Sequence, residues 1–444
     1  MVESVGISGT ERELSAMYRR LPHGPHGMGR DAVARHQRAR LFGAMIEAIH
    51  RQGYKGTTVA HVIALAGVSR RAFYEQFANK EDCFLGTYDI AVARAKRRML
   101  DGWMSERGWA NRVHRACQAF VEDAQRNVKS SRLVLIEGLG LGGKSRERLM
   151  RSALAFERVL ASGFGVAPDG VQLPALGPKA IVGGGRHMIF ERLRTDRVAE
   201  LPMLTDELLD WVSAYRSPAA RIGVPRSAAP HRPVEPARFL ESEEKRARVL
   251  GAVVHLTLDE GYNGLTDPQI AQFAGMSTES FHKHFPSKQE CFVAVVDEFV
   301  DETIAAIAAA AAQADDWPEA AYLGVRAGID HFVAHPGLTK MAFVDLFDVG
   351  PVVTECIGRT LGKLGALLQE TSPEPRRAPL LAHEAVVGAL WSVVGSYATP
   401  KRVKYLPSLV DHLAFMVIAP YVGPKAAGQT IDATRRSLAR DEHY

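Results

Sequence analysis

The sequence predicts an all-α protein made of two similar units in tandem. An internal repeat is the first observation: residues 38–84 and 246–292 align without a gap at an offset of 208 residues, and 17 of the 47 positions are identical. Apolar residues recur at helical spacing through most of the chain, and no alternating run is long enough to indicate a sheet. Between the units, Ser217 to Pro236 holds five prolines, a composition that interrupts helices and favours a linker.

The chain is long enough for several domains. Its 444 residues are 46% hydrophobic and 24% charged, which is typical of a folded globular protein. The predicted segments, in chain order, are a flexible tail at 1–30, a three-helix domain at 31–85, a helical body at 86–216, a proline-rich linker at 217–237, a second three-helix domain at 238–293, a second helical body at 294–424 and a C-terminal tail at 425–444.

The first repeat begins with two predicted helices. Arg38 to Gln52 carries apolar residues at helical spacing and is expected to form an amphipathic helix. Gly53 suits its end, because glycine adopts a positive φ without a steric penalty. Thr58 suits the N-cap of a second helix, since its hydroxyl can accept a hydrogen bond from a backbone N–H of the first turn. Ala66-Gly67 is expected to end this second helix.

Ser69 is predicted to cap a third helix over 70–77. Phe73 and Phe77 stand one turn apart in it and are expected to pack inward. The opposite side then carries exposed polar and cationic side chains. Two short helices joined by a small-residue turn, with a positive outer face on the second, fit the major groove of DNA. The helix that follows, opening at Asn79 or Lys80, presents N–H groups and a dipole that suit a phosphate.

The run from Gly53 to Asp82 resembles the DNA-binding domain of TetR-family transcriptional regulators. The similarity lies in a Thr that opens the second helix, Ala-Gly-Val-Ser at the turn, an aromatic pair and then Phe-x-x-Lys-Glu. The resemblance implies a helical DNA-binding domain followed by a helical body for ligand and dimer contacts. The residues expected to face DNA are Thr58, Ser69, Arg70, Arg71, Tyr74 and Lys80 in the first copy, and Thr266, Ser277, Thr278, His282 and Lys288 in the second.

The second copy differs from the first in its outward side chains. Thr278, Glu279 and His282 stand where the first copy has two arginines and a tyrosine. Residues 30–80 hold nine Arg and Lys against three Asp and Glu, whereas 238–288 hold six against seven. Because non-specific DNA affinity comes mostly from neutralised phosphates, we expect the first copy to dominate DNA binding. The second copy is then weak, differently specific or no longer a DNA reader, and a site contacted by both is not palindromic.

The two bodies are expected to associate through their last helices. The resemblance implies that the final two long helices of each body form a four-helix dimer bundle. Those helices are predicted at 178–196 and 203–216, and at 380–397 and 406–421. Two arrangements remain open: the bodies pair within one chain as a pseudo-dimer, or two chains form a homodimer.

The resemblance also implies a small, often apolar effector bound inside the body, of a chemistry that the sequence does not name. Plain core packing is the alternative for each side chain that could line such a pocket. The candidates are Phe156, His187 and Met188 in the first body, and Phe343, His383, Trp391 and Tyr397 in the second.

Two further patterns point to other chemistry, and both have a simpler interpretation. Gly138 to Ser145 matches the phosphate-binding loop of nucleotide hydrolases, but its flanks look helical and the second half lacks the pattern. A loop between body helices is the preferred interpretation. His331 and His335 have a spacing that can chelate a metal ion, but Pro336 follows at once, which favours a helix end. We therefore predict no metal, no cofactor and no enzymatic activity.

The net charge of +5, the scattered cysteines and the absence of a long apolar run favour a cytoplasmic, nucleoid-associated protein without a membrane segment. The predicted function is regulation of transcription through double-stranded DNA, on family grounds as a repressor. The alternatives are a helical ligand-sensing or scaffold protein that has lost DNA binding, and a phosphate-binding-loop enzyme. The operator, the effector and the sign of regulation stay open, as do DNA binding by the second copy and the oligomeric state.

Overall fold

A computed structural model of the chain describes residues 29–164, 176–215, 244–373 and 381–441. Every element within these residues is a helix, which confirms the predicted all-α class. The proline-rich linker and nearly all of the predicted N-terminal tail lie outside the described residues.

Two compact units divide the chain. The first contains the residues up to Ala95 together with Arg126–Gly138, and the second contains Lys96–Gln125 and everything from Leu139 onward. The division passes through a long helix, α5 (Lys80–Ser105), and the domain boundary predicted at residue 85 falls inside that helix too.

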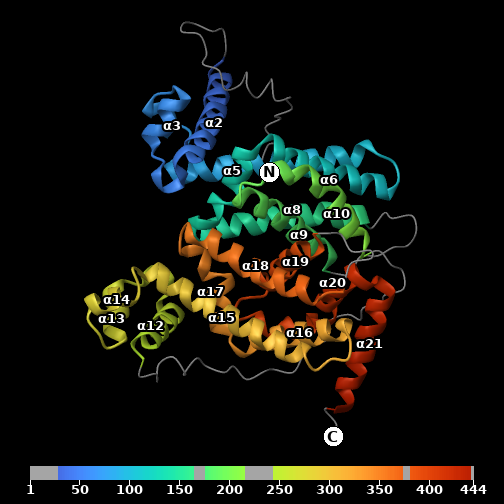
Figure 1. Cartoon of the computed structure of the whole chain (residues 1–444). Coiled ribbons are helices and arrows are strands. Elements are labelled where there is room, and N and C mark those ends of the chain that lie inside the picture. The colour runs from blue at the N-terminus through green and yellow to red at the C-terminus, as the bar shows by residue number, and fades with distance from the viewer. Residues whose placement is uncertain (1–28, 165–175, 216–243, 374–380, 442–444) are drawn as a thin grey trace. The chain divides into compact units, whose positions relative to one another are not determined.

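The first unit holds the first copy of the repeat. It consists of α2 (Arg30–Gly56), α3 (Val59–Ala66), α4 (Arg70–Tyr74), the start of α5 and α7 (Val128–Leu135), drawn in blue to cyan in Figure 1. Helix α2 starts eight residues before the predicted Arg38. Its fully buried side chains recur at helical spacing and pack on aromatic rings of the neighbouring helices, which gives this unit its core. The largest fully buried side chains of this core are Leu41 and Met45 on α2, Phe73 on α4 and Phe84 on α5.

Gly53 bends the end of α2, as predicted. Its φ of 66° is in the left-handed region, where a side chain would be strained. Glu137, which follows α7, accepts a hydrogen bond from the N–H of Tyr54 at 3.0 Å. The carboxylate thus satisfies a backbone donor that the bend has released from the helix.

The second unit contains most of the first body and the whole second half of the chain. The first body comprises α6 (Trp109–Arg126), η1 (Glu137–Leu141), α8 (Gly143–Phe164), α9 (Gly177–Arg194), η2 (Val198–Met203) and α10 (Leu204–Ser213). The second copy of the repeat comprises α12 (Lys245–Glu260), η3 (Tyr262–Gly264), α13 (Asp267–Phe273), α14 (Thr278–His284) and the start of α15 (Lys288–Ala311). The second body continues through α16 (Trp317–Ala334), α17 (Pro336–Phe343), η4 (Asp345–Asp348), α18 (Val352–Thr371), α19 (Ala382–Gly395), η5 (Val403–Leu409), α20 (Val410–Val422) and α21 (Pro424–Asp441).

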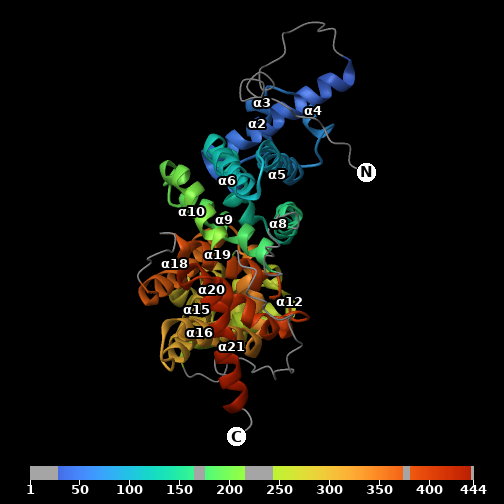
Figure 2. The same cartoon turned by 90° about the vertical axis from the view of Figure 1, so that its right-hand side faces the viewer.

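The two bodies pack against each other within this unit. Helix α9 lies against α19 in both views, and α10 adjoins α19 (Figures 1 and 2). The hydroxyl of Tyr215, just after α10, donates to the carbonyl of Met416 on α20 at 2.9 Å. Trp211, on α10, is fully buried. The four helices predicted to form a dimer bundle therefore meet inside one chain.

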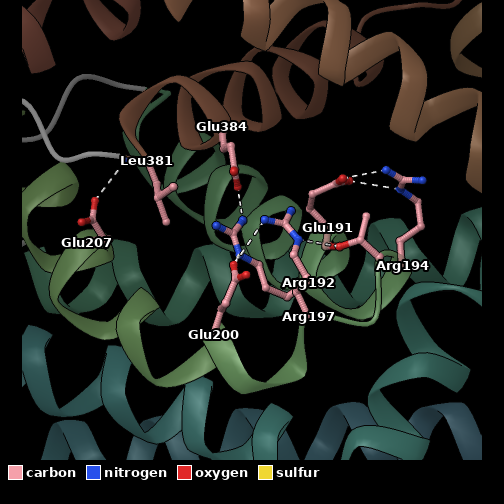
Figure 3. Close-up of polar contacts among 9 residues, drawn as sticks. Glu191, Arg192, Arg194, Arg197, Glu200, Glu207, Leu381 and Glu384 are labelled. Carbon is pink, nitrogen blue, oxygen red and sulfur yellow. Dashed lines mark hydrogen bonds and ion pairs between the residues drawn. The ribbon is translucent and has the colours of Figure 1, made fainter. Parts of the chain in front are cut away.

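Ion pairs surround this contact (Figure 3). Arg192 on α9 is only 2% exposed and pairs with Glu384 on α19, while its Nε lies 3.5 Å from Glu200. Arg194 reaches Glu355 on α18 at 2.8 Å. A buried guanidinium needs such partners, because an unpaired charge in the interior is strongly destabilising.

The glycine-rich run at 138–145, in the first half of the chain, contacts the segment around residues 347–350 in the second half. Gly142 donates its N–H to the carbonyl of Phe347 at 3.1 Å, and a Cβ on Gly140 would lie 2.9 Å from the backbone of Gly350. Helices flank the run on both sides, whereas a phosphate-binding loop follows a strand. The glycines thus allow two backbones to approach closely, and the run lacks the strand that precedes a phosphate-binding loop.

The predicted C-terminal tail is wrong, because Pro424–Asp441 forms helix α21. Ala427, Ile431 and Thr434 recur at helical spacing and are buried, and the helix packs on α16 and α20. Because charged residues lie between these buried positions, the apolar stripe is narrow and the sequence did not predict this helix. One segment, Val403–Val422, has the length and hydropathy of a membrane span, but 67% of its most apolar window is buried, as in the core helices of globular proteins.

Candidate nucleic-acid interface

The first helix-turn-helix has the predicted caps and turn. The Thr58 hydroxyl accepts a hydrogen bond from the N–H of His61 at 3.2 Å and so starts α3. Gly67 ends α3 with a φ of 60°, and the Ser69 hydroxyl accepts from the N–H of Ala72 at 3.1 Å to start α4. These caps fix the angle between the two helices with side chains that the repeat retains.

Helix α4 turns its cationic and phenolic side chains to the surface. Arg70, Arg71 and Tyr74 are exposed, whereas Phe73 between them is fully buried. The guanidinium of Arg71 is 89% exposed and lies 2.8 Å from Glu75. The helix ends at Tyr74, before the predicted residue 77, so its outward face is short.

Lys80 makes two hydrogen bonds within its own domain. Its ammonium donates to the carbonyls of Tyr54 and Thr57 at 2.9 and 2.8 Å, and burial lowers its pKa. Lys288 repeats this arrangement, with its ammonium 2.6 Å from the carbonyl of Leu265. Both ammonium groups therefore hold the segment that precedes the second helix of their domain, and a contact of either lysine with DNA stays a prediction.

Arg40 is a structural residue that sequence reasoning missed. Its buried guanidinium donates to the carbonyl of Ala66 and, at 3.1 Å, to that of Gly67. It thereby fixes the turn between α3 and α4. The signal was present, because Arg248 occupies the same position in the second copy.

The second helix-turn-helix has the same N-caps as the first, but its third helix exposes different side chains. Thr266 accepts from the N–H of Gln269 at 3.4 Å, and Ser277 from that of Ser280 at 3.1 Å. On α14, Thr278 is half-buried, and His282 is exposed with its Nε2 3.8 Å from Asp267. The framework therefore matches the first copy, while the arginine pair is missing.

A large apolar cavity lies in the second body, lined by parts of α15 to α20. Its volume is about 610 Å³. Phe343 and Trp391 form part of the wall, with ring centroids 4.3 Å apart. His383 and Tyr397 are not among the lining residues, and the Tyr397 ring lies under the Arg402 guanidinium at 4.3 Å. The role of these residues in binding a ligand stays a prediction.

The candidates of the first body lie in packed surroundings. His187 and Met188 are buried on α9, and His187 contacts α19 beside Gly388. Phe156 packs edge-on against Phe120 at 5.6 Å. None of the three lines the cavity of the second body.

Metal chemistry has no geometric support in the part of the chain that the structure describes. No group of three or more potential ligand side chains comes together there. The rings of His331 and His335 lie 4.7 Å apart and pack around Phe299, at the end of α16.

Comparison with known proteins identifies both helix-turn-helix segments. The model of the bacterial regulatory proteins of the tetR family matches residues 43–87 and 250–295. The chain therefore carries two TetR-like helix-turn-helix domains in tandem. A similar curated protein is the HTH-type transcriptional activator FasR of Mycolicibacterium smegmatis, 30% identical over 96 residues. The match covers 22% of this TetR-like chain and 43% of FasR, less than half of that relative's length.

Solved structures show weaker similarity. FadR from Bacillus subtilis, in complex with stearoyl-CoA, has 16% identity and a TM-score of 0.36, covering 39% of this chain and 95% of that one. FadR from Bacillus halodurans has 21% identity and a TM-score of 0.35, covering 40% and 96%. Since FasR is named an activator, the likeness of this TetR-like chain to its relatives does not decide between repression and activation.

Proposed function

We propose that the chain regulates transcription by binding double-stranded DNA chiefly through α3 and α4 of its first helix-turn-helix. The observation that carries this proposal is the exposed set Arg70, Arg71 and Tyr74 on a capped helix inside a TetR-family domain. Arginine binds the edge of guanine through two hydrogen bonds, and tyrosine can hold a phosphate. The net charge of +6 over residues 30–80 adds attraction to the phosphate backbone.

Anisotropy of a labelled duplex from the DNA upstream of the chain's own reading frame tests this proposal. The full chain should bind it with an affinity that falls as salt rises, and more tightly than a random duplex of equal length. Arg70→Ala/Arg71→Ala should remove the preference. Binding that is independent of salt, or unchanged in the double variant, would contradict the proposal.

The cavity of the second body supports a small effector of apolar, uncharged character. Its wall is almost wholly apolar, and its charged lining residues are the acidic pair Asp315 and Asp316, with no Lys or Arg. Acidic groups without cations disfavour a strongly anionic ligand. A volume of about 610 Å³ is within the range of small-molecule sites.

Quenching of tryptophan fluorescence is a direct measurement, because Trp317 and Trp391 both line the cavity. Long-chain alcohols should quench more strongly than fatty acids or acyl-CoA thioesters of equal chain length. Ala320→Phe, a change on the cavity wall, should reduce the effect, whereas Ala64→Phe on the exposed side of α3 should not. Preferential binding of the thioesters would contradict the uncharged ligand class.

The intrachain contact of α9 with α19 supports a monomer that acts as a pseudo-dimer. The surfaces expected to join two chains already cover each other within one. Size-exclusion chromatography with light scattering should give one chain mass of 48.5 kDa. A stable species of twice that mass would contradict the pseudo-dimer.

A further inference from the structure

The N-terminal end of α15 in the second helix-turn-helix is occupied by a carboxylate of the same domain. Asp267, the first residue of α13, accepts the backbone N–H of Lys288 through Oδ1 at 3.0 Å. Its other oxygen, Oδ2, lies 3.8 Å from Nε2 of His282. The Ser287 hydroxyl accepts the N–H of Glu290, two residues further on, at 3.4 Å. The first turn of α15 is therefore capped from within.

In the first domain the equivalent residue of α3 is not an acid, and the carboxylates in the first turn of α5 are its own Glu81 and Asp82. Val59 aligns with Asp267, so the first residue of α3 is apolar whereas the first residue of α13 is acidic. Asn79 accepts the N–H of Asp82 at 2.9 Å, and Asp82 in turn accepts the N–H of Ala78 at 3.0 Å. No residue of α3 caps the N–H of Lys80 among the described hydrogen bonds. The N–H of Lys80 thus lacks, among the described contacts, the carboxylate that Asp267 of α13 supplies to the N–H of Lys288.

This difference matters because a helix N-terminus attracts one anion and its dipole acts over only the first turn. A carboxylate already bound there takes the hydrogen bond and adds a negative charge where DNA would bring another. Like charges at this distance repel.

A second observation on the reading helix points the same way. Glu279, on α14, replaces Arg71, and its side chain is 84% exposed with Lys283 at 3.3 Å. The net charge changes from +6 over 30–80 to −1 over 238–288. The acidic residues thus lie on the two elements that would approach the phosphates and the bases.

We propose that the second helix-turn-helix is closed to DNA because the carboxylate of Asp267 stands in the place of a backbone phosphate. Glu279 extends this exclusion to the reading helix. The chain then holds DNA through its first domain alone, and its operator is a single half-site without an inverted mate. This inference rests on DNA binding by the first domain, as proposed above.

The full chain provides the test, with a random duplex and the upstream duplex as probes. The matched variants are Arg70→Ala/Arg71→Ala in the first domain and Thr278→Ala/His282→Ala in the second. The first pair should weaken binding by at least about 10-fold, and the second should leave it unchanged. Equal losses from both pairs would overturn the inference. A wild-type chain that binds no duplex would instead overturn the proposed function.

A variant that restores binding gives the converse measurement. Asp267→Asn keeps an oxygen acceptor for the N–H of Lys288 and removes the charge, while Asp267→Val installs the residue of the first domain. In the Arg70→Ala/Arg71→Ala background, Asp267→Val/Glu279→Arg should restore binding to the random duplex. Each additional phosphate that the protein neutralises should steepen the slope of log affinity against log salt by about 0.9. Unchanged binding in folded variants, checked by circular dichroism, would contradict the role of Asp267.

Discussion

Gly183 on α9 and Gly388 on α19 meet where the two helices cross. A Cβ on Gly183 would lie 2.9 Å from the carbonyl oxygen of Gly388, and one on Gly388 would lie 3.1 Å from that of Gly183. The two glycines are counterparts, because Ala180-Ile-Val-Gly183 resembles Ala385-Val-Val-Gly388. Contact between counterparts is the property of a two-fold interface, which here lies within one chain.

Substitution of Gly388 by alanine should separate these helices. The new methyl group would clash with the Cβ of His187, which cannot rotate away because it belongs to the helix. We expect Gly388→Ala to lower the free energy of unfolding by roughly 1–3 kcal/mol, the usual cost of overpacking. Thermal denaturation of the full chain measures this loss.

Gly362 is the matched control for that substitution. It lies on the exposed side of α18, and nothing stands within 4 Å of an added Cβ. Gly362→Ala should raise stability by up to about 1 kcal/mol, because alanine is the better helix former. Equal effects of the two substitutions would show that the crossing of α9 and α19 is not tight.

The sequence predicted the helices of this interface and left their pairing open between one chain and two, but it did not predict the close approach of α9 and α19. Helical spacing located α9, α10, α19 and α20 to within a few residues. The close approach of Gly183 to Gly388 joins two segments that are distant in sequence, so no local sequence pattern predicts it. The same limit applied to the reading domains: the caps at Thr58 and Ser69 followed from local hydrogen bonding. The hydrogen bonds of Lys80 to the carbonyls of Tyr54 and Thr57, and the contact of Asp267 with the start of α15, depend instead on how separate helices pack.

The ion pair of Arg192 with Glu384 should contribute measurably to the intrachain interface. Glu384→Ala leaves a guanidinium that is 2% exposed with only Glu200, 3.5 Å away, as an acidic partner. We expect a loss of about 3 kcal/mol in the free energy of unfolding, at the low end for a broken buried pair because Glu200 remains. Urea denaturation followed by circular dichroism measures it.

Two further variants separate charge burial from simple truncation. Glu147→Ala removes the partner of Arg151 in a pair that is mostly exposed, so its effect should stay below about 1 kcal/mol. Arg192→Met/Glu384→Leu removes both charges and should recover most of the loss. If the double variant were as unstable as Glu384→Ala, an unpaired charge would not be the cause.

His187 should make stability depend on pH. Burial lowers the pKa of His187 to about 4, and nearby arginines, Arg192 among them, act in the same direction. An unfolded histidine titrates near 6.5. As pH falls from about 6.5 to about 4, the unfolded chain binds a proton that the folded chain excludes, so stability falls. The full loss is on the order of 3 kcal/mol.

Unfolding in urea at a series of pH values tests this dependence. His187→Gln should flatten the decline over that range without abolishing it, because burial also lowers the pKa of His412. His50→Gln removes an exposed imidazole from α2 and serves as the control. A decline that is as steep in His187→Gln as in the parent chain would exclude His187 as its source.

Arg71 should contribute sequence preference rather than general affinity. Its side chain is 89% exposed on α4 and pairs with Glu75, a partner that it can exchange for a base edge. Arg71→Ala should weaken binding to the preferred duplex by about 1–3 kcal/mol and relax the preference at one base pair. Arg51→Ala removes an exposed arginine with a similar i,i+4 partner on α2, and should change no base preference. Competition binding against duplexes altered at single positions distinguishes the two, and a uniform loss across all duplexes would reassign Arg71 to a phosphate.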